Sequence, residues 1–169
     1  MFREISQSEF EPFFGLMAEI ECGSHYNRQD PVHVAYVQER ISRRYGSGAR
    51  FYGMFDGNGA PLGIAGLLID LPLHSDGWGR AELVDIGVFP QYRSQGFGSE
   101  LLTFVENEAR MARAYGLYLV TYALARKTIE FYLKNGYAPV AGIPGTNGPA
   151  DEGDVWLRKI LVEIPQQTT

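Results

Sequence analysis

Hydrophobic residues recur along this chain at two spacings, one typical of helices and one typical of strands. Helical spacing is clearest in one apolar stripe, which consists of Leu101, Leu102, Val105, Ala109 and Ala112. The polar residues that mark the opposite side are Thr103, Glu106, Arg110 and Arg113. This pattern predicts an amphipathic helix of about five turns. Gly116 is well placed to end the helix, and the apolar run Leu117–Tyr122 then predicts a buried strand.

The N-terminal part predicts a short strand, Phe2–Ile5, followed by two helices. The segment Ser6–Glu9 has the S-x-x-E spacing of a capping box, so we expect a helix from about Gln7 to Cys22. Asp30-Pro31 supplies a cap and a first-turn proline for a second helix that ends near Gly46. We expect the buried side of this second helix to consist of Ala35, Val37, Ile41 and Tyr45.

Segments rich in aromatic and β-branched residues predict the next strands. Arg50–Phe55 and Gly63–Ile69 flank a strong turn signal, Asp56–Gly59, and should form an antiparallel hairpin. The strand Arg80–Phe89 precedes the long helix, and Leu117–Tyr122 follows it. A strand, a helix and a strand in this order imply a right-handed crossover between parallel neighbours.

The C-terminal part predicts a short helix and two further strands. The helix runs from about Ala125 to Lys134, ends at Asn135-Gly136 and leads into a strand that starts at Tyr137, and Asp154–Val162 is the last strand. The 169 residues are enough for one domain with a sizeable core. We therefore predict a single-domain α/β fold with a mixed, mostly antiparallel sheet, a central parallel βαβ unit and helices on both faces.

A glycine-rich turn joins a strand to the long helix between Asp85 and Leu102, where the sequence is D-I-G-V-F-P-Q-Y-R-S-Q-G-F-G-S-E-L-L. Gly96 and Gly98 leave the backbone amides at the helix start uncovered, and the helix dipole favours an anion there. We infer a site for the pyrophosphate of a large cofactor. A nucleotide-binding phosphate loop would need a Lys-Ser/Thr pair after its last glycine, and a dinucleotide fold would place its glycine turn after the first strand. Neither alternative matches this sequence well.

Composition narrows the partners and the compartment. A net charge of −5 argues against nonspecific nucleic-acid binding. The longest nearly apolar run, Gly63–Leu71, is far shorter than the roughly 18 residues of a membrane span. The single cysteine, Cys22, cannot form an internal disulfide, which agrees with a reducing compartment, so we expect a cytoplasmic protein with no nucleic-acid or membrane partner. His25, His33 and His74 lack metal-ligand spacing, and no metal is expected.

Three motifs resemble the GNAT superfamily of N-acetyltransferases, and they stand in that family's order and spacing. Arg93–Gly98, with the sequence R-S-Q-G-F-G, fits the acyl-CoA signature R/Q-x-x-G-x-G/A. Ala81–Val88, with the sequence A-E-L-V-D-I-G-V, is similar to the family's fourth strand. Ile129–Tyr137, with the sequence I-E-F-Y-L-K-N-G-Y, resembles the family's late helix-to-strand block.

The resemblance implies an enzyme that uses acetyl-CoA as cosubstrate and needs no metal. The pyrophosphate would bind the amides of the glycine turn, and the guanidinium of Arg93 would add charge-assisted bonds. In this family the fourth strand splays from the fifth, so its free backbone groups pair with the pantetheine arm. The implied cofactor-binding residues are Ile86, Val88, Arg93, Ser94, Gln95, Gly96, Phe97, Gly98 and Ser99.

The resemblance also implies two catalytic residues. Tyr132 matches the family tyrosine that acts as general acid near the thioester sulfur, and a phenol with a pKa of about 10 can donate a proton at neutral pH. Its alternative role is to pack the helix against the sheet. Glu82 matches a position where some members carry a catalytic glutamate, although water can serve as the base and the carboxylate can be a solvated or salt-bridged strand residue. Asp85 is a reserve candidate, because regular alternation turns it to the other face unless a bulge intervenes.

The chain departs from the family at Ala125, where many members have an asparagine that binds the cofactor arm. Arg126 and Lys127 stand beside it and could reach phosphate oxygens or simply begin a solvated helix. The doublet Arg43-Arg44 is expected to be a solvated helix end.

The predicted function is acetyl transfer from acetyl-CoA to a primary amine by direct attack in a ternary complex, and two other classes remain open. One is noncatalytic acyl-CoA binding or sensing. The other is a nucleotide-binding or purely interaction protein, which the missing Lys-Ser/Thr pair disfavours. The acceptor is either a small-molecule amine or an amine of a protein or peptide. Pairing through the late strands is common in the family, which leaves a homodimer open.

Overall fold

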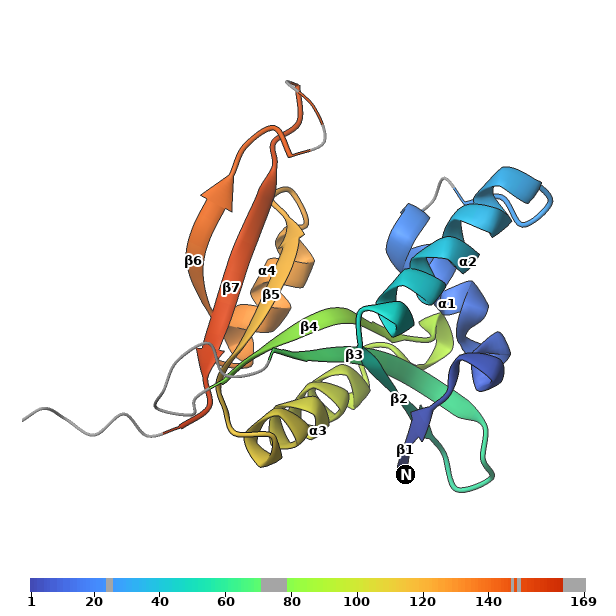
Figure 1. Cartoon of the computed structure of the whole chain (residues 1–169), viewed down its shortest axis with the longest axis horizontal. Helices are drawn as coiled ribbons and strands as arrows, with labels where there is room; N and C mark the ends of the chain where they lie inside the picture. Colours follow the sequence, from blue (N-terminus) through green and yellow to red (C-terminus); the bar gives the residue numbers. More distant parts are fainter. Residues whose placement is uncertain (24–25, 71–78, 147, 149, 163–169) are drawn as a thin grey trace, which may run out of the picture. The chain divides into compact units, whose positions relative to one another are not determined.

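Seven strands and four α-helices make up the part of the chain that the computed structural model describes, residues 1–23, 26–70, 79–146, 148 and 150–162 (Figure 1). The strands are β1 Phe2–Ile5, β2 Arg50–Phe55, β3 Pro61–Asp70, β4 Gly79–Val88, β5 Ala114–Tyr122, β6 Ala138–Ile143 and β7 Asp154–Ile160. The helices are α1 Phe14–Cys22, α2 Pro31–Gly46, α3 Phe97–Met111 and α4 Arg126–Lys134. None of these helices is long and apolar enough to cross a membrane.

The strands are hydrogen-bonded in the order β1-β2-β3-β4-β5-β7-β6. The pair β4–β5 is parallel, whereas β1–β2, β2–β3, β5–β7 and β6–β7 are antiparallel. The predicted mixed sheet with a central parallel βαβ unit is therefore confirmed. The chain forms two compact units, one from Met1–Leu68 and Leu83–Val105 and the other from Ile69–Glu82 and Glu106–Thr169. Strand β4 and helix α3 each contribute residues to both units.

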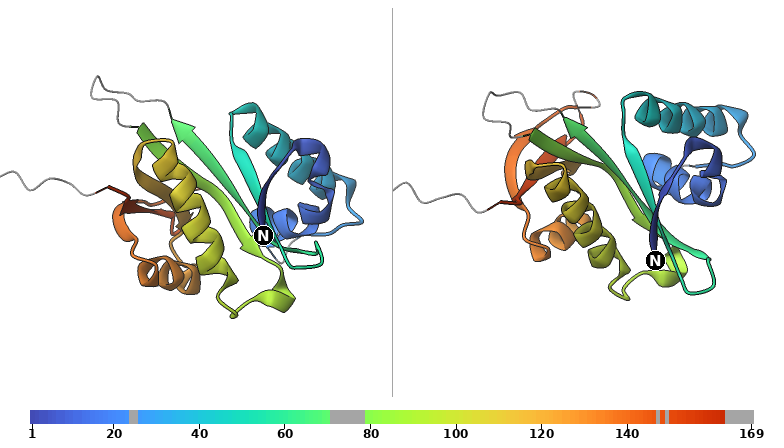
Figure 2. Two further views of the ribbon diagram at one scale, coloured as in Figure 1. Left: turned by 90° about the horizontal axis from the view of Figure 1, so that it is seen from below. Right: turned by 60° about the horizontal axis from the view of Figure 1, so that its bottom comes forward.

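In the first unit, α1 and α2 cover one face of β1, β2 and β3 (Figure 2). Their shared core includes Ile5, Phe10, Phe13, Leu16, Met17, Val37, Ile41, Phe51 and Ile64. On the opposite face, Phe104 of α3 stacks on Phe2 with ring centroids 4.3 Å apart and meets Tyr52 at 5.2 Å. Neighbouring strand residues alternate between the two faces, so Phe51 and Tyr52 reach separate layers. Helices thus lie on both faces of this part of the sheet, as predicted.

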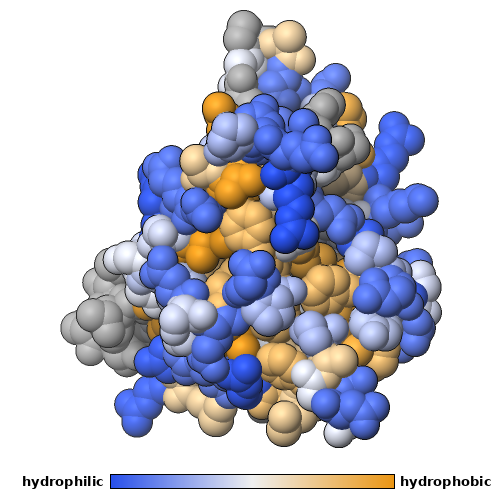
Figure 3. All heavy atoms as spheres, turned by 90° about the vertical axis from the view of Figure 1, so that its right-hand side faces the viewer, coloured by the Kyte–Doolittle hydropathy of each residue, from blue (hydrophilic) through white to orange (hydrophobic). Residues whose placement is uncertain are grey.

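The surface that includes α1 and α2 shows apolar patches bordered by polar side chains (Figure 3). Val32 and Tyr36 of α2 and Ile20 of α1 are among the exposed apolar residues of these helices. Such scattered exposure is ordinary for a folded chain and does not by itself indicate a binding site.

The helix predicted from Gln7 to Cys22 is interrupted. Two 3₁₀ turns, Gln7–Glu9 and Glu11–Phe13, precede α1. Pro12 lies at the start of the second turn and has no N–H to donate, so a continuous α-helix would lose a backbone bond there. The predicted capping box is present, with the Glu9 carboxylate accepting from the Ser6 amide at 3.0 Å.

Two local predictions in the first unit are confirmed by hydrogen bonds. The Asp30 carboxylate accepts from the Val32 amide at 2.9 Å and caps α2. The Asp56 carboxylate accepts from the amides of Asn58 and Ala60 and shapes the β2–β3 turn. By contrast, Ala35 is exposed although it was expected on the buried side of α2, since the core stripe of that helix is formed by Val37 and Ile41.

The end of α3 differs from the prediction. The helix ends at Met111, Arg113 adopts φ 61°, and Ala112 is exposed. Gly116 does not end the helix but lies within β5. A Cβ at this position would lie 3.3 Å from the Lys159 carbonyl oxygen, so the glycine permits the close approach of β7.

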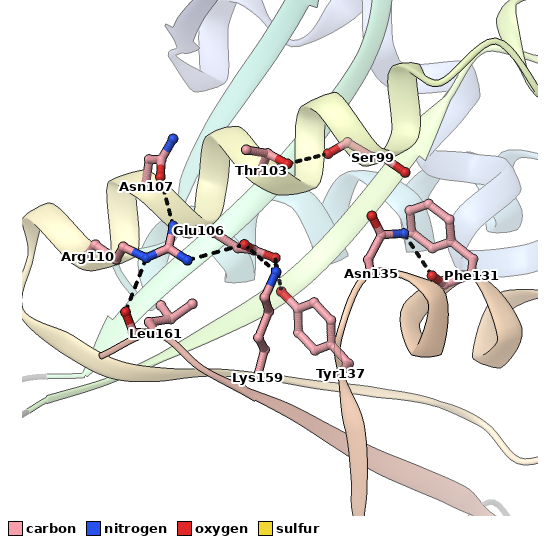
Figure 4. Close-up of polar contacts among 10 residues, drawn as sticks. All are labelled: Ser99, Thr103, Glu106, Asn107, Arg110, Phe131, Asn135, Tyr137, Lys159 and Leu161. Atoms are coloured by element: carbon pink, nitrogen blue, oxygen red, sulfur yellow. Dashed lines mark hydrogen bonds and ion pairs between the residues drawn. The ribbon is translucent and has the colours of Figure 1, made fainter. Parts of the chain in front are cut away.

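In the second unit, Glu106 is a buried carboxylate, whereas the helical pattern placed it on the polar side of α3. Lys159 of β7 donates to its two oxygens at 2.9 and 2.7 Å, and the Tyr137 hydroxyl donates at 3.2 Å (Figure 4). Arg110 lies 3.6 Å away and also donates to the Leu161 carbonyl. The polar side of α3 is therefore covered at this point by residues that follow far later in the sequence.

Candidate functional site

The glycine turn of the first unit leads from a 3₁₀ turn, Pro90–Tyr92, into α3. Ser94 and Gly96 have positive φ values of 61° and 90°. The first backbone bond of the helix is donated by Glu100 to the Gly96 carbonyl at 3.1 Å. The amides of Phe97, Gly98 and Ser99 therefore precede the helical ladder and need other acceptors. This arrangement, with residues 93–96 exposed, suits the oxygens of a phosphate group.

Polar side chains of the turn are tied back to the protein. Arg93 donates through Nε to the Val88 carbonyl at 2.9 Å and through Nη2 to both carboxylate oxygens of Glu19 at 2.8 Å. Gln95 donates to the Gln91 carbonyl at 3.1 Å. These bonds engage the Arg93 and Gln95 side chains, while the amides of the half-buried residues Phe97, Gly98 and Ser99 precede the helical ladder. The bond from the Arg93 guanidinium to a phosphate stays a prediction. To form it, Arg93 would have to bind the phosphate together with Glu19 or in place of Glu19.

Strand β4 extends beyond the residues that are described as paired with β5. The paired residues run from Gly79 to Glu82, whereas β4 extends to Val88 and includes Ile86. Ile86 and Val88, predicted to pair with the pantetheine arm, both lie in this further part of the strand and are half-buried. The first unit thus brings together Ile86, Val88 and residues 93–99, all of the predicted cofactor-binding positions.

The alternation of side chains along β4 is interrupted next to Asp85. Val84 packs against the core formed with α1 and α2, and the next residue, Asp85, forms an ion pair with Arg44 of α2. A Cβ at Gly87 would again meet α1, with Ile20 at 2.9 Å. Two successive side chains thus share one face, as in a β-bulge. Because this bulge turns Asp85 to the same face as Val84, Asp85 stays a candidate site residue.

Asp85 belongs to a charge cluster in which its own carboxylate and that of Glu21 of α1 are buried, whereas Arg40 and Arg44 of α2 are half-buried. Nε of Arg44 lies 3.2 Å from the Asp85 carboxylate, and Nε of Arg40 donates to Glu21 at 2.8 Å. Burial raises the pKa of Asp85 to about 7, the Arg44 charge opposes this rise, and the Glu21 charge adds to it. Arg44 also donates to the Val84 carbonyl, so it is not the solvated helix end expected from the doublet. The side chain of Arg43, in contrast, is 69% exposed.

The raised pKa of Asp85 makes stability depend on pH. Between pH values of about 4 and 7, the folded state binds more protons at this carboxyl than the unfolded state, so its contribution to stability falls as pH rises. We expect Asp85→Asn to remove this fall. The quantity to follow is the free energy of unfolding of the variant minus that of the unsubstituted protein. This difference should increase as pH rises through the window, by a few kcal/mol at most, because one pKa unit corresponds to about 1.4 kcal/mol.

Urea unfolding followed by circular dichroism at several pH values would measure this difference. Glu130→Gln, at an exposed position of α4, serves as the control and should leave the pH dependence unchanged. Parallel pH profiles for Asp85→Asn and the unsubstituted protein would contradict the prediction.

Tyr132 of the second unit is 5% exposed and lies in the last turn of α4. Its ring centroid is 5.2 Å from that of Phe131 and 5.6 Å from that of Tyr137. Burial and the neighbouring Glu106 raise the pKa of Tyr137, whose hydroxyl is already engaged, so Tyr137 is a poor proton donor. Ala125, at the position of the family asparagine, begins α4 without a side-chain cap.

Glu82 lies on the wall of a pocket in the second unit. The pocket has a volume of about 300 Å³ and is lined by Arg80, Ala81, Glu82, Tyr118, Val140, Ala141 and Trp156. Glu82 is half-buried and is paired in register with Tyr118. The sequence identified Glu82 but not the other lining residues. A signal was present for Arg80, which is separated from Glu82 by the strand period of two.

Other reactive side chains contribute little. Cys22 is partly buried, and burial and the nearby Glu21 raise the pKa of its thiol, which disfavours a nucleophilic role. The His33 ring accepts from the Asn27 amide, while His25 and His74 lie outside the described residues. Within the described ranges, no group of three or more His, Cys, Asp or Glu side chains is arranged to hold a metal ion.

The sequence matches the model of one protein family and a curated relative. The model of the acetyltransferase (GNAT) family matches residues 7–137. The aminoalkylphosphonate N-acetyltransferase of Salmonella typhimurium is 38% identical over 80 residues, which is 47% of this chain and 51% of that protein. The chain thus matches about half the length of this relative.

Solved structures resemble the chain over nearly its whole length. An aminoglycoside 6′-N-acetyltransferase complexed with coenzyme A has a TM-score of 0.72 at 18% identity, and the match covers 98% of this chain and 99% of that one. The ribosomal-protein-S18-alanine N-acetyltransferase of Escherichia coli has a TM-score of 0.71 at 16% identity, and the match covers 100% of this chain and 98% of that one. At such low identity these structures establish the fold alone. Together with the family match, they show that the chain belongs to the GNAT family of acetyltransferases.

Proposed function

We propose that the protein transfers an acetyl group from acetyl-CoA to a primary amine by direct attack in a ternary complex. The observation that carries this proposal is the glycine turn, where Arg93 and Gln95 are tied back and the amides of residues 97–99 precede the helical ladder. A pyrophosphate fits such a group of donors, and the positive end of the α3 dipole adds to its binding. The backbone of Ile86 and Val88 is proposed to pair with the pantetheine arm.

The proposed reaction requires that the cofactor is held, the amine is deprotonated, the oxyanion is stabilised and the leaving thiolate is protonated. The amine nitrogen attacks the thioester carbonyl carbon, an amide near Val88 stabilises the oxyanion, and the carbon–sulfur bond then breaks. Tyr132 gives its proton to the thiolate that leaves, and Glu82, directly or through water, takes the proton of the amine.

Noncatalytic acyl-CoA binding is the second candidate, and Ala125 is the observation that favours it. The family asparagine that binds the cofactor arm is missing there, so the arm would be held less firmly. A proton donor at Tyr132 favours the enzyme instead, because a sensor needs no group to protonate a leaving thiolate. The single cysteine supports a reducing, cytoplasmic setting for either function, and a homodimer stays a prediction.

Calorimetry with acetyl-CoA, coenzyme A and ATP tests the cofactor assignment. We expect both CoA species to bind and ATP to bind much more weakly. Failure of both CoA species to bind would overturn the proposal, whereas binding without thiol release on any of a broad panel of amines would favour the sensing function.

Gly96→Ala should weaken acetyl-CoA binding. Gly96 has φ 90° and open space around its Cα, so an added methyl group strains the backbone without a steric clash. The strain is on the order of 1–2 kcal/mol, and we expect a loss of affinity of about tenfold as the turn shifts away from this conformation. Gly57→Ala, at the β2–β3 turn, also meets open space but has no positive φ, and is the matched control. Equal affinities for the two variants would contradict the role of the turn.

A further inference from the structure

We propose that the pocket formed by β4, β5, β6 and β7 holds the acceptor, and that this acceptor is a small amine that also carries an oxyanion group. This inference rests on the proposed function and names its substrate class. The pocket lies entirely in the second unit, and its volume of about 300 Å³ fits a small molecule.

The wall of the pocket combines charged and aromatic side chains. Arg80 and Glu82 are two residues apart on β4, so they share one face of the strand. Tyr118 is opposite Glu82 in the β4–β5 register, and Trp156 is opposite Ala141 in the β6–β7 register. The strand pairing therefore places a carboxylate, a guanidinium and two aromatic rings around one cavity.

Two arginines lie at or beside this cavity, Arg80 in its lining and Arg158 next to Tyr118, although the whole chain carries a net charge of −5. The Arg158 guanidinium lies 5.8 Å from the centre of the Tyr118 ring. Burial alone would raise the pKa of Tyr118, but the hydrogen bond with Tyr115 and the charges of Arg158 and Arg80 lower it overall. Two arginines, Arg158 and Arg80, thus act on the same side chain of the pocket wall.

This charge pattern matches a molecule that carries both signs. A guanidinium binds a phosphonate, phosphate or carboxylate through directed, charge-assisted bonds, so Arg80 is the proposed partner of the oxyanion. Glu82 is the proposed partner of the amine and is also its proposed base. The rings of Tyr118 and Trp156 offer apolar surface to the carbon chain between the two groups. An acceptor with amines alone would offer no oxyanion for Arg80 to bind.

Matched acceptors test the inference by steady-state thiol release. The panel is 2-aminoethylphosphonate, β-alanine, ethanolamine and a lysine peptide, all with acetyl-CoA. We expect kcat/KM for one of the two anionic amines to exceed that for ethanolamine and the lysine peptide by about tenfold or more, the effect of a charged hydrogen bond. Equal or greater activity on ethanolamine or the peptide would overturn the inference and leave the proposed function intact.

Arg80→Gln sharpens the assignment. We expect it to raise KM for the preferred anionic amine by about tenfold and so to remove most of the preference for that amine over ethanolamine. Arg50→Gln, at an exposed position of β2, is the control. An equal effect on both acceptors would contradict the role of Arg80, with circular dichroism and acetyl-CoA calorimetry as checks of folding. If the unsubstituted protein does not bind acetyl-CoA, that result would instead count against the proposed function itself.

Discussion

Tyr132→Phe is expected to lower kcat about a hundredfold or more while it leaves acetyl-CoA binding intact. The leaving thiolate needs a proton, and a well-placed general acid contributes on the order of 10²–10⁴ in rate. Phenylalanine keeps the ring that lies 5.2 Å from Phe131 and 5.6 Å from Tyr137, so the packing of α4 is preserved and the hydroxyl alone is removed. The measurement is thiol release at saturating acetyl-CoA over a range of pH, with single-turnover rates to separate chemistry from product release.

Tyr36→Phe is the control for this experiment, because Tyr36 is an exposed tyrosine of α2. It should retain full turnover. If Tyr132→Phe also keeps full turnover with an unchanged pH profile, Tyr132 is not the general acid and its role is to pack α4 against its neighbours. Loss of acetyl-CoA binding together with turnover would point to a structural effect.

Lys159→Met is expected to reduce the free energy of unfolding by about 2–3 kcal/mol. Lys159 donates to both oxygens of Glu106, a residue only 3% exposed, and its removal leaves this carboxylate with Arg110 at 3.6 Å and the Tyr137 hydroxyl. Removing one partner of a buried ion pair costs about 3–5 kcal/mol, and the partial exposure of the lysine reduces this figure. Urea unfolding followed by circular dichroism measures the change.

Lys134→Met, at an exposed position of α4, is the matched control and should change stability little. A double variant provides a second test. Glu106→Leu combined with Lys159→Met removes both charges, so its loss should be smaller than the sum of the two single losses. If Lys159→Met is as mild as Lys134→Met, the network of Figure 4 does not contribute to stability as proposed.

Local chemistry was sufficient to predict many elements of the fold. The Asp30 cap and the Asp56 turn depend on side chains that bond to amides two to four residues away, so short segments contain the whole interaction. The interruption at Pro12 was also local, and the missing N–H of proline could have revealed it.

Other errors arose where a residue's neighbour lies far along the chain. Glu106 has the spacing of a solvent-facing helix residue, but Lys159 and Tyr137 cover it. Gly116 follows a helix and resembles a terminator, yet its role is to admit the backbone of Lys159. Arg44 belongs to a basic doublet at a helix end, and its partner Asp85 lies on β4. Helical period and composition contain no information about which distant segment packs at a given position.

The sequence by itself determined the order of helices and strands, the glycine turn at the start of α3 and the motifs of the GNAT family, because these depend on backbone preferences and on residues close together in the chain. Only the tertiary structure decided that Arg93 and Gln95 of that turn bond back to the protein and that a break in alternation turns Asp85 toward α2. It also decided that Arg80, Glu82, Tyr118 and Trp156 line one pocket. Strand register and helix packing join residues that are remote in sequence, and hydrophobic pattern alone does not specify which of them meet.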